Sequence, residues 1–121
     1  MSDFDDLART VSIERATSLD LRRASLQVLA GPDAGRRFDI EESARVGARP
    51  LADIVLADAR VSGLHCEFTV GGEAPRVRDL GSKNGTFVGP VRILDARLAP
   101  GDVVTVGETR LQLTPAGTRA V

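Results

Sequence analysis

Residues 25–40 read SLQVLAGPDAGRRFDI, and this stretch decides the class of the fold. Polar and apolar side chains alternate over residues 25–29, which predicts a strand with one buried and one exposed face. Glycine and proline at 31–35 mark a turn, and a second alternating segment follows over residues 37–40. We therefore predict two short strands joined by a turn.

The same pattern continues along the chain to about residue 113. Short apolar or alternating segments, separated by turn residues, are expected to form strands at 45–47, 53–56, 64–70, 75–80, 86–88, 91–93, 103–106 and 110–113. Ten or eleven short strands at such close spacing are typical of an antiparallel sandwich or barrel. No ten-residue segment has strong helical periodicity, which argues against a parallel α/β fold.

The chain of 121 residues is predicted to hold one all-β domain over residues 24–114. Residues 1–23 mix charged residues with Ser and Thr and show no sustained period, so we predict a flexible leader. Residues 115–121 are predicted to be a C-terminal linker. Phenylalanine is the only aromatic residue type and occurs four times, so the core must consist mainly of Val, Leu and Ile.

Composition excludes several classes of function. The net charge of −1 lacks the basic excess of a nucleic-acid binder. Cys66 is the only cysteine, which rules out an internal disulfide and fits a reducing compartment, so we expect a cytoplasmic protein. His65 and Cys66 alone cannot supply the four ligands of a zinc site, and we expect no metal and no cofactor. There is no secretory signal and no apolar run near the roughly 18 residues of a membrane span, so no membrane contact is expected.

The sequence also lacks the motifs of an enzyme. It has no phosphate-cradling glycine loop with a lysine and no paired acid and base. His65 is the only histidine, but no nucleophile or carboxylate motif accompanies it. We therefore expect no catalytic residue and a non-enzymatic function.

Polar loop residues concentrate in three segments, which we call the first loop (46–50), the second loop (58–65) and the third loop (79–86). They contain Gly47, then VSGLH at 61–65, then DLGSKNGT at 79–86. Together with Asp53-Ile54 and the LAPGD turn at 98–102, they resemble in order and spacing the forkhead-associated (FHA) family. This resemblance covers roughly residues 24–114 and implies a β-sandwich of the SMAD/FHA type that binds phosphothreonine peptides.

The resemblance implies a role for each matching position. Ser62 is expected to donate a hydrogen bond to the phosphate, and Asn84 to bond the backbone of the bound peptide. His65 is expected to be a buried structural residue that ties the loops together. Gly47, Gly85 and Thr86 are expected to shape the first and third loops. Phosphothreonine is preferred in the family because its methyl group fills a small apolar niche.

Two positions depart from the family pattern. Ala48 stands where the family has its main phosphate-binding arginine, and Gly63 stands where a second basic residue is expected. Arg49, Arg60 and Lys83 are the candidates to replace the missing cations at a phosphate near −2 in charge. Two interpretations stay open: a phosphothreonine-binding module, or a degenerate domain that acts as a phosphate-independent interaction or dimerisation module.

The leader suggests a wider context. A short acidic, Thr-containing leader before such a domain resembles the N-terminus of bacterial sigma-54-dependent transcriptional regulators. That resemblance implies the regulatory domain of a larger protein. Thr10 and Thr17 lie in polar sequence, and either, once phosphorylated, is a candidate ligand for the domain in cis or in trans.

Overall fold

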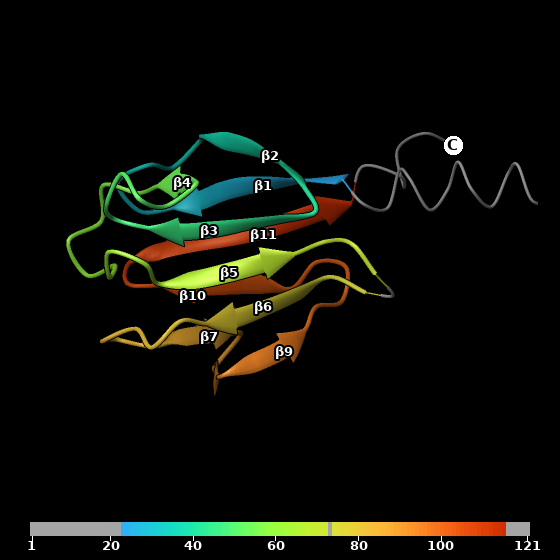
Figure 1. Ribbon diagram of the computed structural model, residues 1–121. Helices are drawn as coiled ribbons and strands as arrows, with labels where there is room; N and C mark the ends of the chain where they lie inside the picture. Colours follow the sequence, from blue (N-terminus) through green and yellow to red (C-terminus); the bar gives the residue numbers. More distant parts are fainter. Residues whose placement is uncertain (1–22, 73, 116–121) are drawn as a thin grey trace, which may run out of the picture.

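The computed structural model describes residues 23–72 and 74–115, which form two β-sheets packed face to face (Figure 1). The strands are β1 (Arg23–Ala30), β2 (Arg37–Glu41), β3 (Ser43–Gly47), β4 (Ile54–Val55), β5 (Cys66–Thr69), β6 (Arg76–Asp79), β7 (Thr86–Val88), β8 (Val91–Ile93), β9 (Asp95–Arg97), β10 (Val103–Val106) and β11 (Thr109–Pro115). One sheet has the order β2-β1-β11-β10-β7-β8 and the other β4-β3-β5-β6-β9. The predicted β-sandwich of about eleven strands is confirmed.

Two details differ from the prediction. The sequence does not predict β9, because its three residues carry no apolar alternation. It forms by pairing with β6, where Val77 lies opposite Ala96. β4 pairs with β3 in parallel over two residues, although every other pair is antiparallel.

The core lies between the sheets and follows from the alternation of the strands. On β1, Leu26 lies opposite Leu113 and Val28 opposite Leu111, and all four are buried. Leu29 follows Val28 on the opposite face of the strand, so its side chain is exposed, and the register with β11 shifts just after Val28. Each fully buried aliphatic side chain of this kind contributes about 1.5–3 kcal/mol to folding.

Phe68 is the only fully buried aromatic side chain among the described residues, and the rest of the core is mainly Val, Leu, Ile and Ala. This agrees with the composition. Cys66 is completely buried in the same cluster, where it packs as a small apolar side chain. Burial raises the pKa of its thiol, and the Asp79 carboxylate adds to the rise.

The connections at one end of the sandwich contain the three predicted loops. β1 begins and β11 ends at the right of Figure 1, whereas the chain between β4 and β5 lies at the left. The first loop joins the second through backbone hydrogen bonds, and the third loop joins it through side chains, as described below. We call this end, formed by the three loops, the loop end. No helix in the described part of the chain is long and apolar enough to cross a membrane.

Candidate phosphopeptide site

The first loop needs glycine at position 47 because the second loop passes directly over it. A Cβ atom on Gly47 would lie 1.9 Å from the carbonyl oxygen of Gly63. Backbone hydrogen bonds join the two loops at this point. The N–H of Ala48 donates to the carbonyl of Ser62 at 3.0 Å, and the N–H of Arg49 donates to that of Gly63 at 3.3 Å.

The two departures from the family pattern fit together in space. The Ala48 side chain is partly buried and packs against the core. The Arg49 side chain crosses the second loop at Gly63, where an added Cβ would lie 2.8 Å from its Cδ and 3.1 Å from its Nε. The absence of a side chain at position 63 therefore leaves room for an arginine that the first loop supplies.

His65 joins the second loop to the third. It is completely buried, as predicted. Its Nδ1 accepts a hydrogen bond from the N–H of Ser62 at 3.0 Å, and its Nε2 lies 2.8 Å from the carbonyl oxygen of Gly85. Since Nδ1 is an acceptor and the carbonyl can only accept, the neutral ring carries its proton on Nε2. Both ring nitrogens are occupied by backbone groups.

Ser62 and Asn84 also connect the second and third loops. The Ser62 Oγ accepts a hydrogen bond from the N–H of Lys83 at 3.0 Å, so its own proton is free to be donated outward. The Nδ2 of Asn84 donates to the carbonyl of Arg60 at 2.8 Å. The structure thus brings Ser62, Asn84 and His65 to one place, while their binding roles stay predictions.

Asp79 organises the third loop from within. Its carboxylate accepts hydrogen bonds from the hydroxyls of Ser82 and Thr86 and from the N–H groups of Gly81 and Ser82. The N–H of Gly85 in turn donates to the Ser82 hydroxyl. Burial alone would raise the pKa of Asp79, but these hydrogen bonds outweigh it and hold the pKa below its ordinary value.

Asp58 anchors the second loop to the turn between β10 and β11. It is 3% exposed and accepts hydrogen bonds from the N–H groups of Arg60 and Glu108 and from the Thr109 hydroxyl, at 2.9, 2.8 and 2.7 Å. Burial again opposes ionisation, yet the three hydrogen bonds lower the pKa of this carboxyl. No role was predicted for the side chains of Asp58 and Asp79, although an aspartate that accepts hydrogen bonds from the backbone two residues further on is a recognised turn signal.

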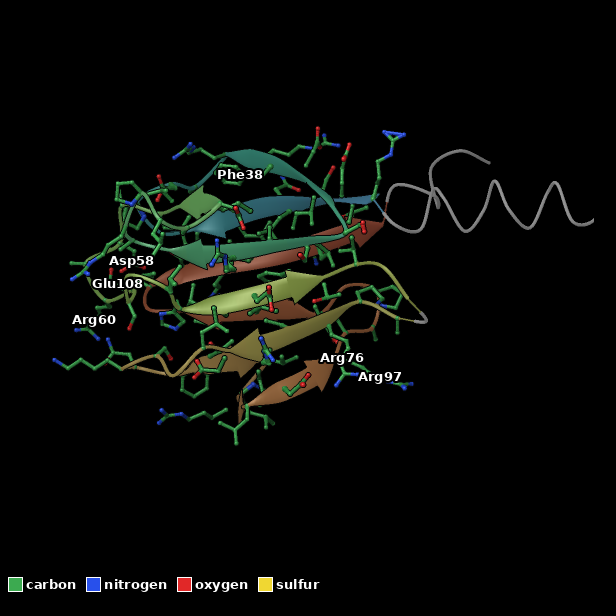
Figure 2. All side chains as sticks on the ribbon, in the orientation of Figure 1. Phe38, Asp58, Arg60, Arg76, Arg97 and Glu108 are labelled. Carbon is green, nitrogen blue, oxygen red and sulfur yellow. The ribbon has the colours of Figure 1, made fainter. Side chains whose placement is uncertain are left out.

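Four cationic side chains surround the three loops: Arg49, Arg60, Lys83 and Arg92. Figure 2 shows Arg60 at the loop end with Asp58 and Glu108, and Arg60 Nε lies 3.6 Å from a Glu108 carboxylate oxygen. Within residues 23–72 and 74–115, the other three form no ion pair. Arg92 was not predicted, because it lies on β8 outside the loop motifs, and only the hairpin brings it against Gly85.

The described residues hold no group of three or more His, Cys, Asp or Glu side chains that could bind a metal ion. Around Ser62 the loop end carries the Ser62 hydroxyl and the exposed side chains of Arg49 and Lys83. Such a surface is suited to an anion carried on an extended ligand.

Comparison with known proteins identifies the family. A family model described as "Inner membrane component of T3SS, cytoplasmic domain" matches residues 27–117. The glycogen accumulation regulator GarA of Mycolicibacterium smegmatis is 43% identical over 89 residues, 73% of this chain and 56% of that protein. An oxoglutarate dehydrogenase inhibitor of Corynebacterium efficiens is 37% identical over 97 residues, 79% of this chain and 68% of that protein. The chain thus spans little more than half the length of the first of these relatives.

Solved structures agree with this result. The FHA domain of the CT664 protein from Chlamydia trachomatis matches with a TM-score of 0.72 and 35% identity, covering 76% of this chain and 96% of that one. A second chain, from a study of phosphothreonine-dependent FHA domain interactions, matches with a TM-score of 0.69 and 30% identity, covering 76% of this chain and 95% of that one. The resemblance to sigma-54-dependent regulators is not shown by these comparisons. The chain belongs to the family of the matching cytoplasmic-domain model, and it is an FHA domain.

Proposed function

We propose that this domain is a non-catalytic module that binds phosphothreonine-containing peptides. The observation that carries the proposal is the position of the Ser62 hydroxyl. It accepts from the Lys83 N–H, and the His65 ring holds the backbone N–H of Ser62, so the loops fix the hydroxyl oxygen while its proton has no acceptor among the hydrogen bonds of the described residues. A hydroxyl fixed in this way can donate to a phosphate oxygen without first being ordered. A neighbouring structure comes from a study of phosphothreonine-dependent FHA interactions, which supports the same ligand.

The charge of the phosphate must be met by cations other than the one missing at position 48. Arg49 is the strongest candidate because its side chain lies across Gly63, the residue next to Ser62. Lys83 is the second, since its backbone N–H already contacts the Ser62 hydroxyl and its side chain is exposed. Arg60 is the weakest, because Glu108 lies 3.6 Å from it and offsets its charge.

The test is a calorimetric titration with a phosphothreonine peptide library and its unphosphorylated twin. The natural chain should prefer the phosphorylated peptides, and Ser62→Ala should weaken that binding about tenfold, the value of one charge-assisted hydrogen bond. Arg49→Gln should weaken it similarly. Arg23→Gln is the matched control, because it removes the same charge at the start of β1, away from the loop end, and should leave the affinity unchanged.

The alternative is the degenerate domain that acts as a phosphate-independent interaction or dimerisation module. One observation favours it: the Ala48 side chain packs against the core and offers nothing to an anion. Equal binding of the phosphorylated and unphosphorylated peptides, unchanged by Ser62→Ala, would rule out phosphate recognition and leave this alternative.

One candidate partner is the chain's own leader, phosphorylated at Thr10 or Thr17, and the length of β1 distinguishes these two threonines. β1 has eight residues and runs from the far end toward the loop end, so Arg23 begins about 24 Å from the three loops. Thr17 precedes Arg23 by six residues and Thr10 by thirteen. An extended chain spans about 3.5 Å per residue, so Thr17 reaches about 21 Å and Thr10 about 45 Å. We therefore propose that phosphorylated Thr10 readily reaches the loops of its own chain, whereas the backbone of Thr17 falls about 3 Å short of them at full extension and phosphorylated Thr17 favours a second copy.

This proposal is tested with chains phosphorylated at one threonine only. The form carrying phosphate on Thr10 should stay monomeric in sedimentation and bind an added phosphopeptide more weakly than the unmodified chain. The form carrying phosphate on Thr17 should associate with increasing concentration. If both forms stay monomeric and bind added peptide as the unmodified chain does, the leader is not a ligand.

Other partners are suggested by the names of relatives. One relative is a glycogen accumulation regulator and another an oxoglutarate dehydrogenase inhibitor. We infer that this domain likewise serves a regulatory protein that acts by binding another protein. A place at the N-terminus of a larger transcriptional regulator stays a prediction from sequence resemblance.

A further inference from the structure

The third loop contains Asn84, the only asparagine in the chain, directly before Gly85. An asparagine followed by glycine is the pair most prone to spontaneous deamidation, because glycine has no side chain to shield its backbone nitrogen from the asparagine amide. Asn84 is exposed, and it is the residue expected to bond the backbone of a bound peptide. A chemical change at this position would therefore act on the candidate site directly.

The reaction is defined by the two groups that take part in it. The backbone nitrogen of Gly85 gives up its proton and attacks Cγ of Asn84, so that a cyclic imide forms and Nδ2 leaves as ammonia with that proton. Water from the solvent then opens the ring at one of its two carbonyl carbons. One product carries aspartate at position 84, and the other carries isoaspartate, in which the backbone runs through the side-chain carbons. Both products replace a neutral amide by a carboxylate.

Both reacting groups are held by hydrogen bonds in the folded chain. The Gly85 N–H donates to the Ser82 hydroxyl at 2.9 Å, and the Asn84 Nδ2 donates to the carbonyl of Arg60 at 2.8 Å. Because the Ser82 hydroxyl donates its own proton to Asp79, its oxygen is left to accept from Gly85. Ring closure abolishes both hydrogen bonds, since the Gly85 N–H and the Asn84 Nδ2 are the groups that it consumes.

The backbone around Gly85 is also enclosed by its neighbours. Gly85 is buried with φ of +92°, and its carbonyl oxygen lies 2.8 Å from Nε2 of the His65 ring. The Arg92 side chain lies against it, with Nε 2.7 Å from the position of an added Cβ. The Gly85 nitrogen is therefore reached only when the third loop opens locally.

These contacts predict how strongly the fold slows the reaction. One hydrogen bond shifts an equilibrium about two- to tenfold in net terms. With one such bond on each reacting group, the folded chain is expected to deamidate about four- to a hundredfold more slowly than the unfolded chain. Loss of the bond from Gly85 to Ser82 alone should remove about two- to tenfold of this protection.

We propose that Asn84 is a modification site at which the chain deamidates spontaneously, at a rate set by the hydrogen bonds to Ser82 and Arg60. The product weakens phosphate binding at the loop end, because it places a carboxylate one residue after Lys83, whose N–H contacts the Ser62 hydroxyl. A carboxylate there repels a phosphate near −2 in charge. This consequence rests on the proposed function, whereas the reaction at Asn84 and its rate do not.

The experiment follows the intact mass of the full chain during incubation at physiological pH and temperature. Because Asn84 is the only asparagine, the mass gained from amide to acid reports on this site, and peptide mapping assigns it. The samples are the folded natural chain, the natural chain denatured in guanidinium chloride, Ser82→Ala and Ser43→Ala. Ser43→Ala is the matched control, because it removes an exposed hydroxyl at the start of β3, whereas the first loop lies at the end of that strand. Circular dichroism checks that both variants are folded.

We expect the denatured chain to deamidate about four- to a hundredfold faster than the folded chain, and Ser82→Ala about two- to tenfold faster than the folded natural chain. Ser43→Ala should react at the natural rate. Equal rates in the folded and denatured chain overturn the proposal, and this comparison decides it even if Ser82→Ala does not fold. A folded Ser82→Ala that reacts no faster than Ser43→Ala, or a denatured chain that gains no mass, overturns it as well.

A binding measurement separates this inference from the proposed function. Deamidated chain, separated from unreacted chain by ion exchange, is titrated with a phosphothreonine peptide and its unphosphorylated twin. It should bind the phosphopeptide about tenfold or more weakly than the unreacted chain does. If it binds as tightly, the proposed consequence of deamidation is wrong. If the unreacted chain itself does not prefer the phosphopeptide, the proposed function fails, while the mass measurements still decide whether Asn84 is the modification site.

Discussion

The loop end and the outer face of the five-stranded sheet use their carboxylates in different ways. On the sheet face, Asp95 pairs with Arg76 at 3.0 Å, and both side chains are about half exposed. At the loop end, Asp58 and Asp79 instead accept hydrogen bonds from backbone N–H groups and hydroxyls. The carboxylates of the sheet face neutralise arginines, and these two carboxylates of the loop end hold the backbone of the loops.

Among the described residues, Asp58 and Asp79 accept hydrogen bonds from N–H groups and hydroxyls and form no ion pair with Arg49, Lys83 or Arg92. These three cations are therefore not paired with a carboxylate of the described residues, although the net charge of the chain is −1. Figure 2 shows Asp58 within the loop end, whereas Arg76 and Arg97 lie toward the other end of the sandwich. The total charge of a chain does not show which cations are paired with a carboxylate and which are not.

The largest expected effect is on stability, when one methyl group is added to a glycine at either end of the sandwich. Gly47→Ala should lower the free energy of unfolding by about 3 kcal/mol or more, because the new Cβ would collide with the Gly63 carbonyl. Gly71→Ala, in the turn after β5, should have almost no effect, because nothing lies within 4 Å of its added Cβ. Urea denaturation measures the free energy of unfolding of both variants. Equal stabilities would mean that the first two loops do not approach as closely as described.

The second prediction compares one carboxylate from each region. Asp58→Ala should cost about 2–3 kcal/mol, because it leaves the donors of Arg60, Glu108 and Thr109 without their acceptor in a buried place. Asp95→Ala should cost about 0.5 kcal/mol or less, because it removes only an exposed ion pair. Thermal unfolding measures the stability of both variants. A larger loss of stability in Asp95→Ala than in Asp58→Ala would contradict this prediction.

Acid should weaken the loop end through these same carboxylates. The pKa values of Asp58 and Asp79 are lowered in the folded chain, so the folded state binds fewer protons than the unfolded state. Their contribution to stability is therefore complete above the ordinary Asp value of about 3.9 and is lost as the pH falls through the lower folded values. Between pH 6 and pH 2, the free energy of unfolding should fall less steeply in each of the variants Asp58→Asn and Asp79→Asn than in the natural chain. Parallel curves would show that neither carboxylate is responsible.

The smallest expected effect concerns the contact between Arg49 and Gly63. Gly63→Ala should cost about 1 kcal/mol in the natural chain, since the new methyl group lies 2.8 Å from Arg49 Cδ. In an Arg49→Ala background the same substitution should be close to neutral. A double-mutant cycle measures this coupling. Strict additivity would mean that the arginine does not occupy the space above Gly63 in solution.

Much of the fold could be predicted because alternation along a strand is a local property. The strands around Leu26, Phe68 and Leu111 follow from which side chains must be buried. β9 could not be predicted this way, since its residues are recruited by pairing with β6. Of the candidate site, the burial of His65 and the meeting of the three loops were predictable from the resemblance to the FHA family. The hydrogen bond between Asp58 and Glu108 was not, because it joins residues fifty positions apart.

By itself, the amino-acid sequence determined the β-sandwich and the set of polar residues in its loops, because turn residues and alternating side chains act within a few positions of each other. Only the tertiary structure decided where the cations near these loops lie. Ala48 and Gly63 look like two separate losses along the chain, yet the close approach at Gly47 lays Arg49 across Gly63. Likewise, the hairpin of β7 and β8 brings Arg92 to Gly85. Contacts between side chains of different loops depend on how the backbones pack, and no local pattern records that packing.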